Sequence, residues 1–344
     1  MKKFLLFVFL GIGLAAFGQQ AEPLHLYFVR KVADTVSPDD MRGEKMWAKT
    51  PYSASFVFNA PKKDSRLTCD TVFQAVYNSK YLFVRVKAEE PQVDKLNFSP
   101  SSKVNRDMGA VFRTAHVEFF LDPDLLGKSA GQVVANIQGA IYDAIVCGGT
   151  KDWNYDVVTY SKKGNKEWYI MVAFPFIDKG VAVTNVFGMF PHSSPLIAFN
   201  ACRSYAVNGQ RATQWSKTPD NSYDRPNKYG ILVMSGEKDV MNTLQKFLAV
   251  REYSSLMLEG AVKNASSIYL VAIRKAITSG LTNGRMLAEP RKSQVMKEFR
   301  DMQKRLQKKL PDGELAKILN RCGVLNAEIS SAQTRMGSSI LDEF

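Results

Sequence analysis

Histidine is scarce in this chain of 344 residues, which holds only three. His25, His116 and His192 lie in unrelated contexts, so a zinc triad or a histidine-based nucleophile relay is poorly supplied. The sequence also lacks the H-E-x-x-H helix and the phosphate-binding G-x-x-x-x-G-K-[ST] loop. These absences argue against zinc peptidases and P-loop nucleotide-binding enzymes.

Long apolar runs are absent beyond the N-terminal segment, and a membrane-spanning helix needs about 20 such residues. Residues 1–18 join Lys2 and Lys3 to a short apolar run, which is the layout of a secretory signal. We expect cleavage after Gly18. Because Gln19 stands where a lipoprotein needs cysteine, no lipid anchor is expected. The sequence therefore predicts a secreted or periplasmic protein.

Cysteine is limited to four residues, Cys69, Cys147, Cys202 and Cys322. An oxidising compartment would permit disulfides, with three alternative full pairings. Cys69 and Cys202 each lie in apolar, strand-like runs, where an unpaired buried thiol behaves as a small hydrophobic side chain. Both alternatives stay open, and the spacing of the four residues matches no metal site.

Positive charge predominates, with a formal net charge of +13 that falls to +11 when Lys2 and Lys3 leave with the signal. Much of the excess lies between Arg274 and Lys309. The natural acidic partners of an exported basic protein are anionic glycans or a membrane surface, because intracellular nucleic acid is out of reach. A charge run of this kind is also typical of a solvated helix face.

Residues 67–234 have the pattern of β structure. The β-branched and aromatic runs 67–77 and 81–88 are separated by Asn78-Ser79-Lys80, which predicts a hairpin. Further runs of this type follow, joined by loops rich in Asp, Asn, Gly, Pro and Ser. So many short strands without helical periodicity indicate a mainly β fold, an antiparallel β-sandwich of jelly-roll-like form.

After Gly236 the periodicity becomes helical, with apolar residues such as Val295 and Phe299 separated by lysine and arginine. Breaks near 280–290 and 311–313 predict two long helices and a shorter third segment. We therefore expect three parts along the chain: a signal peptide at 1–18, a β-sandwich at 19–236 and an α-helical C-terminal region at 237–344.

The stretch Gln214–Leu232 (QWSKTPDNSYDRPNKYGIL) holds aromatic residues on a loop braced by prolines. Such a loop is either a hydrophobic plug or a platform for a flat ligand. Sugars present apolar C–H faces ringed by hydroxyl groups, so they are recognised by aromatic walls with polar side chains at the edges. The loop is therefore a candidate sugar-binding element.

A series of motifs leads from Met46-Trp47 to this loop, in the order TVFQAVYNSKYLFVRVKAEEP, AHVEFFLDPD, QVVAN, EWYIMVAFPF, FNACRS and QWSKTPDNSYDRPNKYGIL. Their order and spacing over residues 46–232 resemble the family 9 carbohydrate-binding modules. The resemblance implies a non-catalytic β-sandwich that is stabilised by calcium and grips the end of a sugar between two aromatic side chains. The expected partner is a mono-, oligo- or polysaccharide, neutral or anionic, bound in the course of glycan degradation.

The resemblance also implies ligand-binding residues by their place in the motifs. Phe112, just before the VEFFLD strand, and Tyr223, eight residues after Trp215, correspond to the two aromatic walls, and Trp215 would anchor the loop from below. Glu118 falls on a polar ligand position, and Asn136 lies in the V-x-N strand.

Several positions depart from the family pattern. The two walls are Phe112 and Tyr223 where tryptophan is usual, which lowers the stacking area. Val134 stands where a basic side chain is usual, and Met171 and Ala115 stand where acids are usual. The resemblance therefore implies the fold more directly than it implies the sugar.

Three other functions stay open. The C-terminal helices could carry the function by self-association or by binding a protein partner, with the sandwich as a scaffold. A glycosidase needs only two carboxylates about 5 to 10 Å apart, and Glu118 and Asp122 lie four residues apart on one face of a strand. Related sandwiches bind haem, for which the candidate axial ligands are Met171, Met189, His116 and His192.

Overall fold

The computed structural model describes residues 23–58, 69–99, 106, 109–146, 151–178, 181–182, 194–204, 207, 212–218, 223, 225–251, 253, 255–263 and 265–341. They form a β unit of Leu24–Phe247 with Met257–Ala265, and a helical unit of Leu248–Leu256 with Ser266–Phe344. The predicted signal peptide, Cys147, Met189 and His192 lie outside the described residues.

The β unit contains two sheets that share one strand. The first runs in the order β8 (Lys151–Asp152), β7 (Ile141–Val146), β6 (Ala130–Asn136), β5 (His116–Asp122), β13 (Leu196–Arg203), β15 (Gly230–Met234) and β1 (Leu24–Lys31). The second continues from β1 through β3 (Thr71–Tyr77), β4 (Tyr81–Glu89), β10 (Glu167–Pro175) and β9 (Val158–Lys163). Shorter strands are β2 (Val57–Phe58), β14 (Thr213–Gln214), β16 (Leu256–Gly260) and the pair β11 (Ile177–Asp178) and β12 (Val181–Ala182).

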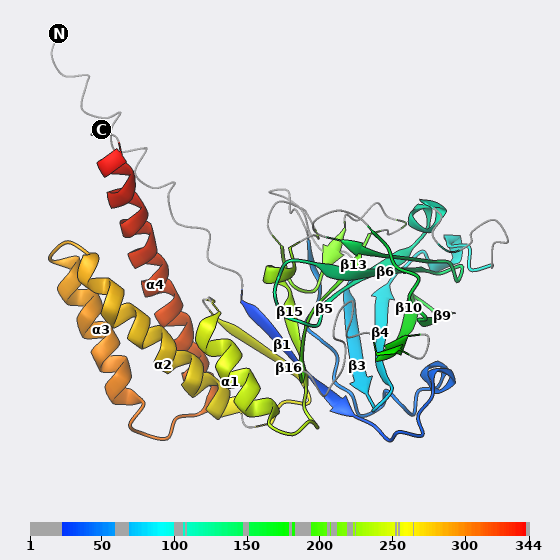
Figure 1. Ribbon diagram of the computed structural model, residues 1–344, viewed down its shortest axis with the longest axis horizontal. Helices are drawn as coiled ribbons and strands as arrows, with labels where there is room; N and C mark the ends of the chain where they lie inside the picture. The colour runs from blue at the N-terminus through cyan, green and yellow to red at the C-terminus, as the bar shows by residue number, and fades with distance from the viewer. Residues whose placement is uncertain are drawn as a thin grey trace, which may run out of the picture. The chain divides into compact units, whose positions relative to one another are not determined.

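The predicted hairpin is confirmed by strands β3 and β4, which lie side by side in Figure 1 with Tyr77 opposite Leu82. The side chain of Asn78 closes the turn, because its Oδ1 accepts hydrogen bonds from the backbone N–H groups of Lys80 and Tyr81 at 2.8 and 2.9 Å. An asparagine that satisfies its own turn in this way is a strong local signal for a tight connection.

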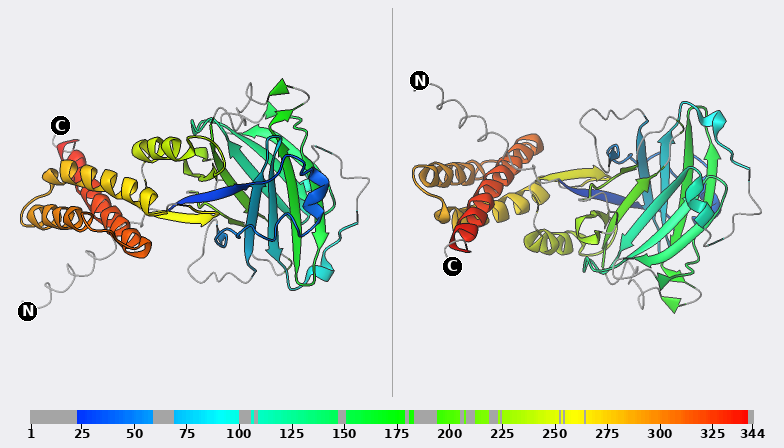
Figure 2. Two further views of the ribbon diagram at one scale, coloured as in Figure 1. Left: turned by 90° about the horizontal axis from the view of Figure 1, so that it is seen from below. Right: turned by 90° about the horizontal axis from the view of Figure 1, so that it is seen from above.

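Strand β1 departs from the predicted antiparallel pattern. It pairs in parallel with β15, where Leu26 lies opposite Ile231, and in parallel with β3, where Arg30 lies opposite Val76. The other pairings among the long strands are antiparallel. Because β1 passes from one sheet to the other, it joins the two layers seen in Figure 2.

The core of the β unit lies between the two sheets and takes side chains from both, including those of β5, β6 and β13 on one side and β3, β4 and β10 on the other. Trp168 and Trp215 are fully buried in it. Trp153 stacks on Tyr155 with ring centroids 4.2 Å apart. The mainly β, sandwich-like fold with C-terminal helices predicted from the sequence is confirmed.

The C-terminal region contains more elements than predicted. The helices are α1 (Val240–Val250), α2 (Ala265–Asn283), α3 (Arg291–Arg305) and α4 (Asp312–Leu341). The expectation of two long helices with a shorter third segment is wrong, because α4 spans 30 residues and Leu256–Gly260 forms strand β16, which pairs with β1. Among the described residues, no helix combines the length and apolar character needed to cross a membrane.

Cysteine pairing can be read for three of the four residues. Cys69, Cys202 and Cys322 are buried and carry free thiols. Each of them is 1% exposed or less, so it packs as a small apolar side chain. For these three residues the free-thiol alternative holds.

Candidate functional site

Strand β5 places polar and aromatic side chains on the outer face of the first sheet. Its residues 117, 119 and 121 lie in the core, and successive side chains of a strand alternate between faces. His116, Glu118, Phe120 and Asp122 therefore point to the outer face. We call the following group around them the β5 cluster: Phe112, His116, Glu118, Gln132, Ser204 and Tyr223.

Glu118 lies at the centre of the β5 cluster. Its Oε2 accepts a hydrogen bond from Gln132 Nε2 at 2.8 Å, and its Oε1 accepts one from Ser204 Oγ at 2.7 Å. The residue is 7% exposed, and no lysine or arginine of the described chain forms an ion pair with it. A carboxylate offers about four acceptor positions, so Glu118 keeps capacity for a further donor such as a hydroxyl group.

His116 is held beside this carboxylate. Its Nδ1 lies 2.6 Å from the carbonyl oxygen of Thr114, which can only accept, so Nδ1 is the donor. The other ring nitrogen, Nε2, lies 3.7 Å from Glu118 Oε1. The imidazole thus lies beside the carboxylate without a hydrogen bond to it, and its ring contacts the exposed ring of Phe112.

Phe112 provides an exposed aromatic ring at the margin of the cluster. It lies on the 3-10 helix η3 (Gly109–Arg113), whose Val111 is fully buried and anchors the segment. The ring of Phe112 is 40% exposed and makes edge contacts with His116 and Tyr142 at centroid distances of 5.6 and 5.3 Å. A large apolar ring that is held in place yet open to water is available for stacking.

Tyr223 lies at the opposite margin and is half-buried, with its ring centroid 5.8 Å from that of Phe120. Burial raises the pKa of its phenol above the ordinary value, and the nearby Cys202 and Glu118 add to this effect. The side chain of Ser204, which hydrogen-bonds the phenol, acts in the other direction. The phenol therefore stays protonated at neutral pH and can donate a hydrogen bond.

The order of the strands places Glu118 between these two rings. Phe112 contacts Tyr142 on β7, which lies beyond β6 on one side of β5. Tyr223 is close to Cys202 on β13, which pairs with β5 on the other side. The β5 cluster thus combines two aromatic rings with a central, nearly buried hydrogen-bond acceptor.

Asn136, predicted to contact the ligand, is 1% exposed. Its Oδ1 accepts hydrogen bonds from the backbone N–H groups of Gln138 and Ala140 at 3.0 and 2.9 Å. These bonds close the connection between β6 and β7. The side chain therefore shapes the loop behind the cluster rather than its surface.

Trp215, also predicted at the site, is fully buried in the core of the β unit. Its ring centroid lies 5.0 Å from that of Phe73, and its Nε1 donates to Glu259 Oε2 at 3.1 Å. This placement suits the expected role of anchoring the segment and leaves no ring face for a ligand. Of the predicted site residues, the structure brings Phe112, Glu118 and Tyr223 together.

Sequence reasoning missed Gln132 and Ser204, which hold the carboxylate. Gln132 shares strand parity with Val134 and Asn136, and Ser204 shares it with Cys202, so alternation along the strands was the available signal. Val134 lies directly opposite both Glu118 and Tyr142 and is fully buried. The buried side chain of Val134 is therefore apolar at the position where the resemblance to the family 9 modules predicts a basic side chain.

Met171 and His116 cannot both be axial ligands of one haem. Met171 packs with Trp47 and Phe83 on the outer face of the second sheet, whereas His116 lies on the outer face of the first. Two side chains on opposite outer faces of a sandwich cannot share an iron. Met189 and His192 lie outside the described residues.

The resemblance predicts bound calcium. In the described part of the chain, no group of three or more His, Cys, Asp or Glu side chains could hold a metal ion. Calcium takes six to eight oxygen ligands. Asp122, the second carboxylate of the glycosidase alternative, instead accepts a hydrogen bond from the backbone of Gly127 at 2.8 Å. Its present contacts are those of a loop-stabilising residue, and calcium binding stays a prediction.

No protein-family profile matches the chain, and no curated protein matches it. Solved structures do. A family 9 carbohydrate-binding module from Caldicellulosiruptor kristjanssonii with glucose has a TM-score of 0.43 and 12% identity, and covers 62% of this chain and 97% of its own. The module with cellotriose has a TM-score of 0.41 and 13% identity, covering 62% and 95%.

A third similar structure is a candidate carbohydrate-binding protein from Bacteroides uniformis, with a TM-score of 0.46 and 17% identity. It covers 61% of this chain and 99% of its own. The function proposed below rests on the side chains of the β5 cluster.

Proposed function

We propose that this chain is a non-catalytic carbohydrate-binding protein that holds a sugar against the β5 cluster, with Phe112 and Tyr223 as its aromatic walls. The observation that carries this proposal is the placement of Glu118 between the two rings. Its carboxylate is held by Gln132 and Ser204, has no basic partner among the described residues and is open to a further donor. A sugar would donate a hydroxyl to Glu118 while its C–H face stacks on the aromatic ring.

The charge of the cluster narrows the ligand to a neutral sugar. Glu118 is negative, and the position opposite it on β6 is the apolar Val134. A carboxylate or sulfate on the sugar would meet this charge without compensation, and like charges at short range are repulsive in a partly desolvated site. A neutral mono- or oligosaccharide has no such penalty.

The proposal includes an extracytoplasmic location and structural calcium. Residues 1–18 support secretion or export to a periplasm. Mass spectrometry of the mature chain tests this, with Gln19 as the expected first residue. Thermal melts with calcium and with a chelator test the metal, since an ion that binds only the folded state raises the midpoint.

An array of neutral and acidic glycans, probed with the mature protein in calcium and in chelator, tests the function. We expect binding to neutral glycans and no release of shortened products. Failure to bind any neutral glycan in either condition would refute the proposal. Release of product that is lost in Glu118→Gln would instead favour the glycosidase alternative.

A further inference from the structure

Helix α3 and the turn that follows it are the most basic part of the helical unit. Residues 291–309 contain eight basic and two acidic side chains, a net charge of +6 out of +13 for the whole chain. Lys297, Arg300 and Lys304 recur at intervals of three and four residues, so they lie on one side of the helix, and Lys308 lies in the turn that follows it. We call these four residues the α3 basic face.

The apolar side of α3 is used inside the helical unit. Val295 and Phe299 are fully buried, and Met302 is nearly so. Phe299 packs so closely on Gly280 of α2 that a side-chain carbon at Gly280 would collide with its ring. The Met302 sulfur lies 3.7 Å from Cys322 Sγ of α4. The opposite side of α3 is therefore left to solvent, and all four residues of the α3 basic face are exposed.

The acidic residues near α3 pair with other cations. Glu298 is bonded by Arg321 of α4 at 2.7 Å, and Glu314 is bonded by Arg305 at 3.0 Å. Glu328 is bonded by Arg291 at 2.6 Å. These pairs stabilise the contact between α3 and α4.

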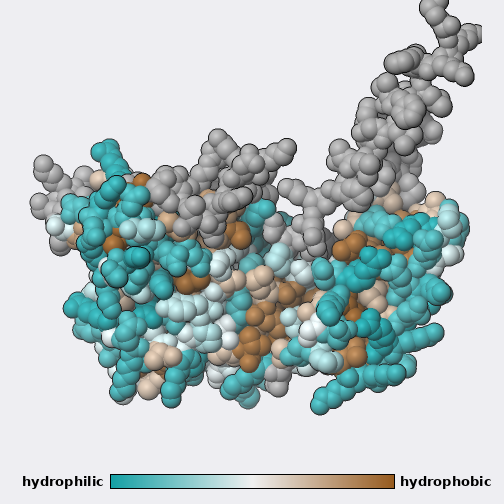
Figure 3. All heavy atoms as spheres, turned by 180° about the vertical axis from the view of Figure 1, so that it is seen from behind, coloured by the Kyte–Doolittle hydropathy of each residue, from teal (hydrophilic) through white to brown (hydrophobic). Residues whose placement is uncertain are grey.

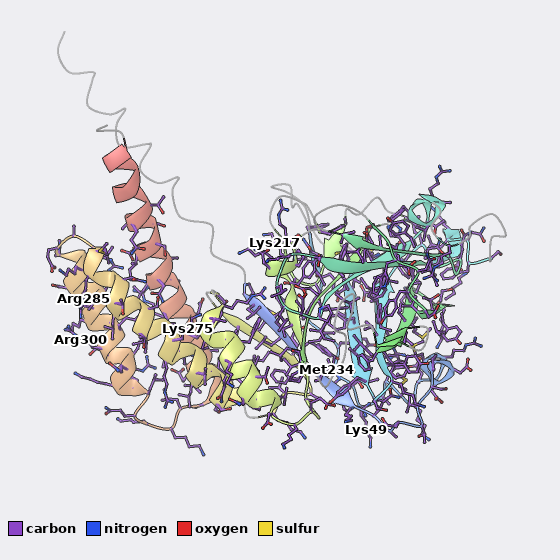
Figure 4. The ribbon with its side chains drawn as sticks, viewed as in Figure 1. Lys49, Lys217, Met234, Lys275, Arg285 and Arg300 are labelled. Atoms are coloured by element: carbon purple, nitrogen blue, oxygen red, sulfur yellow. The ribbon has the colours of Figure 1, made fainter. Side chains whose placement is uncertain are left out.

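No ion pair within the described chain involves the α3 basic face. Asp301 is the acidic residue on that side of the helix and is exposed. Arg300 lies on α3 in Figure 4, and the face of the helical unit seen in Figure 3 is largely hydrophilic. The positive charges of the α3 basic face are thus exposed to solvent and are not neutralised by ion pairs within the described part of the helical unit.

We propose that the α3 basic face is a second binding surface, for an anionic polysaccharide that carries carboxylate or sulfate groups. Lys297 and Lys304 are about 10 Å apart along the helix axis with Arg300 between them, and Lys308 follows in the next turn of the chain. A linear polymer with regularly spaced negative charges can contact these cations through several ion pairs at once. This proposal is independent of the neutral-sugar site on the β unit.

The packing of α3 favours a polysaccharide over a membrane. A helix that lies in a lipid interface inserts an apolar face, and the apolar face of α3 is already buried against α2 and α4. Single-stranded nucleic acid is usually held by stacking on exposed aromatic rings in addition to charge. The aromatic residue of α3, Phe299, is fully buried. The α3 basic face can therefore bind a partner only through its positive charges, and this mode of binding suits a flexible polymer of anionic groups.

The experiment compares two variants of the full mature chain with equal net charge. One replaces the α3 basic face by Lys297→Gln, Arg300→Gln, Lys304→Gln and Lys308→Gln. The control replaces four exposed lysines of the β unit by Lys45→Gln, Lys49→Gln, Lys128→Gln and Lys263→Gln. The probes are heparin for sulfate groups, polygalacturonate for carboxylate groups, neutral dextran, duplex and single-stranded DNA, and vesicles containing phosphatidylglycerol.

We expect the wild type and the control to bind heparin or polygalacturonate, and the α3 variant to lose at least tenfold in affinity. Binding should weaken as salt rises, because exposed charges are screened. Equal losses in both variants would show a net-charge effect and overturn the proposal, as would unchanged binding by an α3 variant with native helical content. The proposal would also be overturned if DNA or vesicles bound more tightly than heparin and polygalacturonate and this binding were lost in the α3 variant. That result would identify DNA or the membrane as the ligand. Neutral-glycan binding, measured on the same proteins, reports separately on the β5 cluster.

Discussion

Tyr223 has a half-buried ring that rests on Phe120 and a phenol whose pKa burial raises. If it is a wall for the sugar, Tyr223→Ala should weaken glycan binding by about 1 to 3 kcal/mol with little change in stability. Tyr223→Trp should then strengthen binding through a larger stacking area. Calorimetric titration and thermal melts on both variants measure these effects.

A plug would give the opposite pattern at the same position. Truncation of a core aromatic to Ala costs about 3 to 5 kcal/mol of folding free energy, and enlargement to Trp causes overpacking. Two variants with lowered midpoints and unchanged glycan affinity would therefore remove Tyr223 from the site.

Asp122 gives a pH dependence of stability. Burial raises its pKa to about 7, and the neighbouring carboxyl of Asp124 adds to the shift, while the backbone N–H of Gly127 opposes it. In the unfolded chain the pKa of an aspartate is about 3.9. The folded state therefore binds the proton more tightly, and this contribution to stability is complete below about pH 4 and is lost as the pH rises through about 7.

Asp122→Asn should remove this dependence, because the amide is neutral and its oxygen can still accept from Gly127. We expect the variant to gain stability relative to wild type at pH 8 and to gain little at pH 4. Denaturant titrations of both proteins at the two pH values measure the difference. If the difference in unfolding free energy between the variant and the wild type were the same at both pH values, Asp122 would not be the source of this pH dependence.

At the scale of elements, strand β16 completes the β unit from beyond helix α1. Its Glu259 lies 2.7 Å from His25 Nδ1, accepts the backbone N–H of Ala54 at 2.6 Å and accepts Trp215 Nε1 at 3.1 Å. The residue is 8% exposed. A buried carboxylate with three partners holds β1, the segment before β2 and the anchoring tryptophan together.

Glu259→Ala should cost about 3 to 5 kcal/mol of unfolding free energy, because its buried donors would be left without an acceptor. The matched control is Glu237→Ala, which removes the half-exposed Lys31 pair and should cost about 0 to 1 kcal/mol. Urea titrations compare the two. For the same reason, a fragment of residues 19–236 should melt well below one of residues 19–265, and equal midpoints would contradict this role of β16.

The sequence predicted pairing between strands that are neighbours in the chain, and it did not predict pairing between strands that are far apart in the chain. The β3–β4 hairpin was predicted because its turn is built by Asn78 itself. Strand β1 was not assigned, because its parallel partner β15 lies about two hundred residues away, with Leu26 opposite Ile231, and no local turn signals that pairing. Strand β16 was assigned as helical because its five residues lie between two helices.

The candidate site was predictable only in part. The motif positions indicated Phe112, Glu118 and Tyr223, and the structure places all three in the β5 cluster. Gln132 and Ser204 lie on other strands, and their contact with Glu118 depends on registers that sequence does not fix. Alternation gives the face of a side chain, but not which neighbour it meets.

At the scale of the whole molecule, we propose different binding chemistries for the two units. The β unit presents aromatic rings around an acidic acceptor, which suits a neutral sugar. The helical unit presents the α3 basic face, which suits an anionic polymer. On the β unit, Phe112 and Glu118 are proposed to form part of the neutral-sugar site.

The most direct test is a titration of the mature protein with the neutral glycan that binds best on the array, comparing Phe112→Ala with Tyr52→Ala. The two rings are matched, since Phe112 is 40% and Tyr52 is 41% exposed, but Tyr52 lies outside the β5 cluster. We predict that Phe112→Ala loses about 1 to 3 kcal/mol of binding free energy while Tyr52→Ala loses none, with both variants folded as wild type. Unchanged affinity in Phe112→Ala, or an equal loss in both, would contradict the account.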